Sequence, residues 1–112
     1  MTTTITGSSI IAGRITSTIT TDNDLNFDIS TVNNFFCTLS APATLDFSGL
    51  AAGQTGNILL VNTGGNTVGR NSTVVKVPST FLSTVSASGT YWINYFCPDG
   101  SKVYVSTDGA LA

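Results

Sequence analysis

The 112-residue sequence contains no histidine and no glutamate. Without an imidazole, the chain lacks the side chain that most often acts as a general base near neutral pH. Ser-His and Cys-His nucleophile pairs are therefore excluded within one chain. The usual zinc ligand sets are excluded too, because only two cysteines and six aspartates remain. We expect no catalytic residue, no metal site and no cofactor.

Charge is also scarce. Charged residues make up 9% of the chain, whereas about 25% is usual for soluble domains. The four basic residues, Arg14, Arg70, Lys76 and Lys102, are scattered and form no patch. Nucleic-acid binding usually needs a basic patch or stripe, so we expect no nucleic-acid partner. The 19 threonines and 13 serines must supply solubility, and β-branched threonine favours strands over helices.

Long apolar runs are absent, so no segment is expected to span a bilayer. The N-terminal MTTTITGSSIIAGR lacks the basic start and the continuous apolar block of a secretion signal. We therefore expect no membrane partner and synthesis in the cytosol, where thiols stay reduced. Cys37 and Cys97 lie in strand-like segments and could meet across a core. The reducing compartment favours two buried free thiols, and a disulfide remains the alternative.

Alternation of apolar and polar residues predicts a series of strands. The clearest example is the segment from Asp24 to Ile29, in which Leu25, Phe27 and Ile29 share one side. The segments with a strand pattern are 24–29, 33–40, 44–47, 57–62, 71–77, 90–97 and 102–107. Turn signals lie at 63–66 and 98–101, residues 79–88 read as a long connection, and no convincing helix is present.

Seven or eight strands at a spacing of about 8–12 residues predict an all-β fold, an antiparallel β-sandwich or jelly-roll-like domain over residues 24–112. The alternate positions of the strongest strands predict the core. We expect Leu45, Phe47, Ile58, Leu60, Ile93 and Tyr95 to be buried.

Residues 1–23 are rich in Thr, Ser and Ile and are expected to form an extended N-terminal arm. Its isoleucines are too few for an independent core, so the arm needs a partner surface. The candidate binding residues are Ile5, Ile10, Ile11, Ile15 and Ile19. The alternative is a frayed tail without function.

The segment from Thr90 to Cys97 carries aromatic residues on both faces. Tyr91, Ile93, Tyr95 and Cys97 share one face, and Trp92, Asn94 and Phe96 share the other. The second set is a candidate surface for contact between copies or for a ligand. Packing is favoured over a sugar-binding platform, because aromatics on both faces of a central strand usually pack.

Three other patterns give only weak indications of a functional site. Oxygen side chains alternate from Asp22 to Asp28, but an EF-hand loop needs Gly where Phe27 stands and Glu where Asn33 stands. Thr73 and Lys76 imitate a Ser-x-x-Lys pair without its partner motifs. The Thr-x-Thr array near Thr16 ends after three steps, too short for an ice-binding face.

The order of strands and turns from Ala43 to Gly109 resembles a small all-β module of tailed-phage virions, cyanophages included. Such modules occur in tail-fibre tips and in capsid decoration (cement) proteins. The matching residues are Leu45–Phe47, Gly56–Ile58, Tyr91–Phe96, Asp99-Gly100 and Val103–Ser106. The resemblance covers about 60% of the chain and rests on strand and turn pattern rather than on a catalytic signature.

The resemblance implies a virion protein assembled in the host cytoplasm. Because the sequence starts with Met and has no long shaft region, we expect a decoration protein on the capsid surface. The family implies a homotrimer, with the major capsid protein as partner and the arm gripping a capsid subunit or a neighbouring copy. A distal tail-fibre module that recognises a host glycan or protein is the first alternative, and a secreted or surface β-sandwich of non-viral origin is the second.

Overall fold

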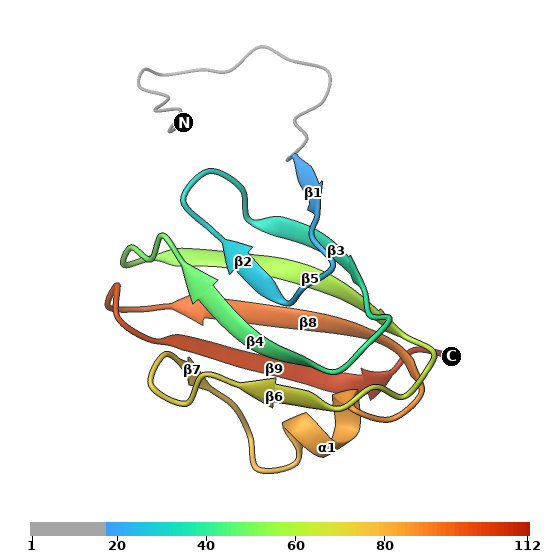
Figure 1. Ribbon diagram of the computed structural model, residues 1–112. Helices are drawn as coiled ribbons and strands as arrows, with labels where there is room; N and C mark the ends of the chain where they lie inside the picture. The colour runs from blue at the N-terminus through green and yellow to red at the C-terminus, as the bar shows by residue number, and fades with distance from the viewer. Residues whose placement is uncertain (1–17) are drawn as a thin grey trace.

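The computed structural model describes residues 18–112, which form two β-sheets and one short helix (Figure 1). The six-stranded sheet has the order β1 (Ile19–Thr21), β3 (Asn34–Thr38), β5 (Gln54–Asn62), β8 (Gly89–Cys97), β9 (Val103–Ala110) and β7 (Val75–Lys76). The three-stranded sheet has the order β2 (Asn26–Asp28), β4 (Ala43–Ser48) and β6 (Val68–Arg70). The helix α1 (Phe81–Val85) lies between β7 and β8 in the chain. The prediction of a mostly β fold is confirmed.

The first six strands alternate between the two sheets along the chain. From β3 to β6, each strand lies beside the strand two places earlier in the chain and runs in the same direction. β1, β3 and β5 pair in parallel, and so do β2, β4 and β6. β7 also pairs in parallel with β9. The prediction of an antiparallel topology is thus wrong except for β5, β8 and β9, which form the two antiparallel pairs.

The core lies between the two sheets. Phe27 on β2 packs against Phe35 on β3 with ring centroids 4.7 Å apart, and Phe47 on β4 packs against Tyr95 on β8 at 5.1 Å. These contacts join the sheets, and their tilted geometry is one that aromatic pairs favour. All six residues predicted for the core are buried: Leu45, Phe47, Ile58, Leu60, Ile93 and Tyr95. The period-2 alternation therefore identified the inward face correctly.

The structure departs from the sequence prediction at its shortest elements. The strand expected over 71–77 is confined to Val75–Lys76, and β6 was not predicted. The expectation of no helix is wrong, because residues Phe81–Val85 form α1. Phe81 and Val85 lie about one helical turn apart on the same side of this helix, and both are buried. α1 lies beside β6, and the Ser86 hydroxyl accepts a hydrogen bond from the Val68 N–H at 2.9 Å.

The hairpin between β8 and β9 has the expected turn. One carboxylate oxygen of Asp99 accepts hydrogen bonds from the backbone N–H groups of Ser101 and Lys102, at 3.0 and 3.1 Å. Gly100 takes a φ of 76°, which glycine adopts without strain. This turn holds β8 and β9 side by side and fixes the sheet surface described next.

Candidate functional site

β8 separates buried and exposed side chains by strict alternation. Tyr91, Ile93, Tyr95 and Cys97 point into the core and expose 2% or less of their surface. Trp92, Asn94 and Phe96 project from the opposite side, where Trp92 exposes 54% and Phe96 exposes 50%. The predicted division of this segment is confirmed. We call the side of the six-stranded sheet that points away from the core the outer face.

A row of amides crosses the outer face. Asn34 on β3, Asn57 on β5 and Asn94 on β8 are register neighbours, and Ser106 on β9 continues the row. The Trp92 Nε1–H donates to Asn57 Oδ1 at 2.9 Å, and the Asn57 amide N–H donates to Asn34 Oδ1 at 3.4 Å. These bonds fix the indole and leave its ring face open. Within the described residues, the side chains of Asn94 and Ser106 make no hydrogen bond, so both can bind a partner.

A shallow hollow of about 720 Å³ lies on the β1 side of the outer face. We call it the tryptophan hollow, and its apolar lining comes from four strands and the chain after β9: Ile19, Phe35, Phe36, Leu59, Trp92 and Leu111. The register sets Trp92 opposite Leu59 and Leu59 opposite Phe36, so these side chains form one continuous apolar row.

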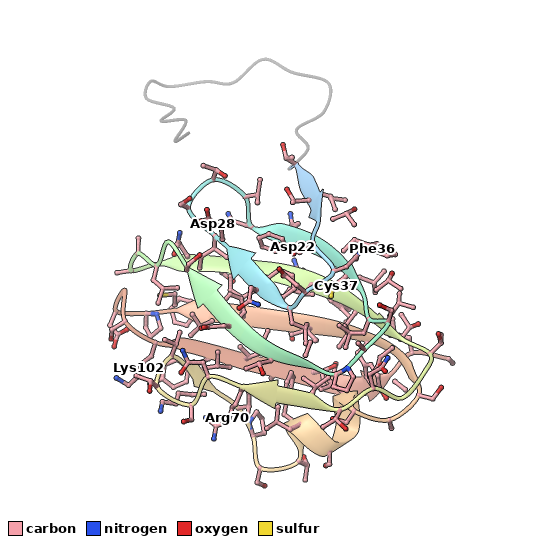
Figure 2. All side chains as sticks on the ribbon, viewed as in Figure 1. Asp22, Asp28, Phe36, Cys37, Arg70 and Lys102 are labelled. Atoms are coloured by element: carbon pink, nitrogen blue, oxygen red, sulfur yellow. The ribbon has the colours of Figure 1, made fainter. Side chains whose placement is uncertain are left out.

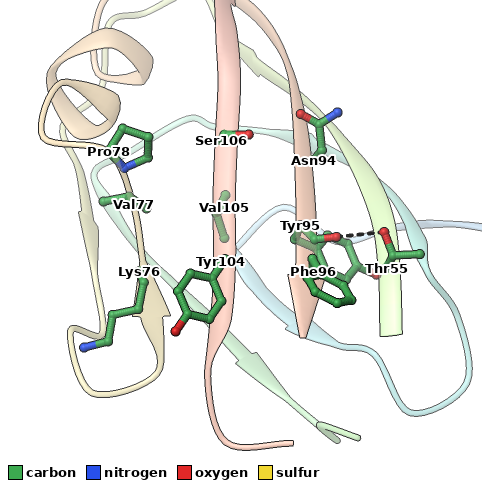
Figure 3. A pocket seen from close by; sticks show the side chains of 10 residues that line it. All are labelled: Thr55, Lys76, Val77, Pro78, Asn94, Tyr95, Phe96, Tyr104, Val105 and Ser106. Carbon is green, nitrogen blue, oxygen red and sulfur yellow. Dashed lines mark hydrogen bonds between the residues drawn. The ribbon is translucent and has the colours of Figure 1, made fainter. Parts of the chain in front are cut away.

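A second hollow, of about 610 Å³, lies on the β7 side (Figure 3). We call it the tyrosine hollow, because the Tyr104 ring stands beside that of its register partner Phe96. Lys76 lies on the other side of Tyr104, where its Nζ donates to the Ser72 carbonyl at 2.7 Å. Asn94 and Ser106 line the end of this hollow.

The outer face carries almost no charge. β1, β3, β5 and β8 contain no charged residue, and the six-stranded sheet contributes only Lys76 from β7 and Asp108 from β9. Other charges lie elsewhere: Asp22 and Asp28 sit at the β1–β2 end of the molecule, and Arg70 and Lys102 at the β6–β7 end (Figure 2). A partner of the outer face must therefore be held by apolar contact and neutral hydrogen bonds.

Within residues 18–112, every large apolar side chain that is exposed belongs to this face or to a hollow in it. They are Ile19, Phe36, Trp92, Phe96, Tyr104 and Leu111. The predicted surface of Trp92, Asn94 and Phe96 is therefore the centre of a larger one. Tyr104 was missed, although it alternates with buried Val103 and Val105 in the same way as Trp92 does with its neighbours. Phe36 and Leu59 were missed because a surface shared by several strands depends on strand register, which the alternation within one strand does not give.

The predicted arm is described only at its end. Ile19 lies in β1, paired beside β3 at the sheet edge, and exposes 69% of its surface. Ile5, Ile10, Ile11 and Ile15 lie outside the described residues. The arm therefore joins the body at the border of the tryptophan hollow.

The acidic segment has a structural explanation. A carboxylate oxygen of Asp24 accepts the Asn26 N–H at 2.9 Å, and Asp28 accepts the Ser30 N–H at 3.0 Å. Hydrogen bonds lower the pKa of both Asp24 and Asp28, while partial burial and the neighbouring Asp24 raise the pKa of Asp22. No group of three or more potential ligands among histidine, cysteine and acidic side chains occurs in residues 18–112.

The two cysteines are free and buried, as the sequence favoured. Burial raises the pKa of the Cys37 thiol to about 11, so it stays protonated near neutral pH. Lys76 is hydrogen-bonded to Ser72 rather than to Thr73, whose N–H donates to Asn71 Oδ1 at 3.2 Å. The Thr73 and Lys76 side chains are therefore not joined by a hydrogen bond in the described structure.

In the described part of the chain, no helix has the length and apolar content needed to cross a bilayer. No protein-family model, curated protein or solved structure matches the chain.

Proposed function

We propose that this protein is a non-enzymatic structural protein of a virion, a capsid decoration protein that binds the outer surface of a phage head and stabilises it. The observation that carries the proposal is the outer face, where the exposed large apolar side chains of the described residues gather on nearly uncharged strands. Such a surface contacts the other subunits of an assembly by complementarity of shape and apolar contact, which suits a structural protein. The resemblance of the segment from Ala43 to Gly109 to phage virion modules supplies the setting.

The residue types of the outer face support a role without catalysis. Apart from Lys76 on β7 and Asp108 on β9, they are aromatic and aliphatic side chains, amides and hydroxyls, which do not act as general bases near neutral pH. The full sequence also lacks histidine and glutamate. We class the body as a two-layer sandwich of mixed topology, a rigid platform suited to presenting one flat surface.

The partners in this proposal are the major capsid protein and further copies of the chain, with the homotrimer taken from the resemblance. Neither nucleic acid nor a membrane is a partner. The protein is placed on the capsid surface of particles assembled in the host cytoplasm. The N-terminal arm provides the grip on the shell, because strand addition to an exposed edge gives affinity with little sequence demand.

Quantitative mass spectrometry of purified particles of the encoding virus tests the proposal. A copy number that scales with that of the major capsid protein supports a shell protein. Absence of the chain from mature particles rejects a virion role. Adding the protein to undecorated shells should also raise the temperature at which they break.

A distal tail-fibre module that recognises a host glycan or protein is the second candidate. The specific observation in its favour is Trp92, whose open indole is fixed by Asn57 beside the free amide of Asn94. An aromatic ring next to hydrogen-bonding amides suits the apolar face and hydroxyls of a sugar. A few copies per particle, located at the tail tip, would select this candidate.

A further inference from the structure

We propose that the outer face of the six-stranded sheet is the contact through which copies of this chain assemble with one another. The inference deepens the proposed function, because it assigns a surface to the copy–copy contact. It can nevertheless be tested on the purified protein without any particle.

The exposed apolar area matches what an interface needs. Trp92, Phe96 and Tyr104 each expose about half of their surface, which leaves roughly 300 Å² from these three rings. Ile19, Phe36 and Leu111 bring the patch to roughly 500–600 Å², the upper end of what monomers expose. A standard interface covers about 800 Å² per partner, and about 65% of it is apolar in homodimers. The outer face therefore offers the apolar area of one side of such an interface.

The distribution of charge favours a second copy over an unlike protein. Unlike partners are usually selected by complementary charge, and a face with strong charge of one sign repels its own copy. The four neighbouring strands β1, β3, β5 and β8 carry no charge at all. The part of the outer face formed by these four strands thus has no charge with which to select an unlike partner, and none that prevents self-association; Lys76 and Asp108 lie on the outer strands β7 and β9.

The amide row suits contact between identical surfaces. An asparagine amide both donates and accepts hydrogen bonds, so the amides of this row can bond to any amide or hydroxyl of a neighbouring copy. Asn94 and Ser106 have side chains free for such bonds, whereas Asn57 already holds Trp92. The tryptophan hollow and the tyrosine hollow lie on either side of this row. A copy in a closed ring can therefore offer one hollow to each of its two neighbours.

The tyrosine hollow shows how a neighbour could be seated (Figure 3). Phe96 and Tyr104 form an aromatic floor, and Asn94 and Ser106 stand at its end. An exposed apolar side chain of a neighbouring copy would lose its contact with water on this floor. Aromatic residues surrounded by neutral polar groups are the usual centre of a tight protein interface.

Sedimentation velocity of the full-length protein at micromolar to submillimolar concentration gives the first test. We expect a species larger than the 11.6 kDa monomer. A monomer throughout this range would overturn the inference. The single tryptophan provides a second reading, because Trp92 is the only one in the chain and lies on the outer face. Its emission should shift to the red on dilution, as the assembly dissociates and the indole meets water.

Asn94→Asp is the decisive variant. It keeps the shape of the side chain, breaks no side-chain hydrogen bond within the described residues and places like charges at the contact. We expect the dissociation constant of the assembly to rise about tenfold or more. Asn33→Asp is the matched control: it makes the same change at an exposed residue that lines neither hollow, and should leave the assembly intact.

Equal assembly by the two variants would show that the copies meet elsewhere. Trp92→Ser is a second variant expected to disrupt the assembly. Circular dichroism checks that the Asn94→Asp and Trp92→Ser proteins are both folded. Binding to shells separates this inference from the proposed function. A monomeric Asn94→Asp protein that still binds shells supports both assignments, because the shell is then contacted by another surface. An assembly that binds no shell keeps this inference and rejects the decoration role.

Discussion

Gly56 stands where the backbone of β5 passes closest to Tyr95 and to the chain before β3. The Tyr95 hydroxyl donates to the Asn33 carbonyl at 2.7 Å, and this bonded pair lies directly against Gly56. A Cβ at Gly56 would lie 2.5 Å from the Tyr95 hydroxyl and would overlap the Asn33 carbonyl oxygen. We expect Gly56→Ala to lower the free energy of unfolding by about 1–3 kcal/mol, measured by urea denaturation.

Gly69→Ala is the control for this substitution. The nearest atom to a Cβ there is the Thr44 hydroxyl oxygen at 3.7 Å, an ordinary contact distance. The control should change stability far less than Gly56→Ala. Similar losses at the two sites would mean that strand propensity, and not the close approach to Tyr95, explains the glycine.

Ile93 is the most direct test of the core assignment. It exposes 1% of its surface between the two sheets. Ile93→Ala should cost about 2–5 kcal/mol of unfolding free energy, because it removes buried methylene groups and leaves a cavity. Its neighbour Asn94 projects from the outer face, and Asn94→Ala should cost within about 0.5 kcal/mol under the same denaturation conditions. A loss below that value for Ile93→Ala would place the core on the wrong side of β8.

The buried thiol of Cys37 should make the free energy of unfolding depend on pH in the alkaline range. Burial raises the pKa of its thiol from 9.0 to about 11. Above pH 9 the unfolded chain loses this proton while the folded chain keeps it up to about pH 11. The unfolded state then binds fewer protons, so the free energy of unfolding falls as pH rises through this interval. Below pH 9 both states are protonated, and the thiol makes no contribution to the pH dependence.

Urea denaturation between pH 8 and 10 measures this slope before the buried Tyr95, whose pKa is also raised by burial, can contribute much. The Cys37→Ala variant should show a shallower decline over the same pH range. Only the slopes are compared, since the substitution also removes packing. An unchanged slope in the variant would contradict the assignment to Cys37.

At the scale of elements, Asn62 ties the end of β5 to α1. Its side chain is fully buried and donates to the carbonyls of Asn66 and Val85 at 2.9 and 2.8 Å, while its Oδ1 accepts the Asn66 N–H at 2.8 Å. Asn62→Ala would leave these groups without partners. We expect a loss of about 2–3 kcal/mol, measured by urea denaturation. Thr63→Ala, at the exposed next residue, should be nearly neutral.

The sequence predicts which side of a strand is buried better than it predicts the partner of that strand. Alternation identified the buried faces of β2, β4 and β8, because a pleated strand has the same period whatever lies beside it. It carries no information on direction, so the parallel return of alternate strands was missed. Only the β8–β9 turn, with Asp99 and Gly100, has the local signature of a hairpin, and it was found.

The sequence did not predict the shortest elements, β6 and α1, for a different reason. β6 has three residues and contains Gly69, and α1 has five residues without a side-chain cap at Thr80. Neither is stable or recognisable alone, since tertiary packing determines such short pieces. The outer face was predicted in its centre because one strand supplies Trp92 and Phe96. Its full extent depends on strand register, which period-2 alternation does not give.

For the whole molecule, the scarcity of charge means that neutral side chains supply most of the polar surface. A chain with 9% charged residues relies on threonine, serine and asparagine for contact with water. The outer face gathers the exposed aromatic side chains, and the arm enters this same sheet at β1. The molecule therefore has two separate means of contact, a flat face and an N-terminal segment, and they can serve different partners.

Two truncations separate these means of contact. Removing residues 1–17 leaves every described strand and should leave the melting temperature nearly unchanged. Removing residues 1–21 also deletes β1, exposes the edge of β3 and should lower the melting temperature. If the arm anchors the protein, both truncations should lose attachment to undecorated shells, and the shells should lose the protection against heat that the full-length protein gives. The measurement is the fraction bound after sedimentation of the shells. Undiminished binding by the 1–17 deletion would assign the grip on the shell to the folded body, because that variant keeps every described strand and lacks residues 1–17 of the arm.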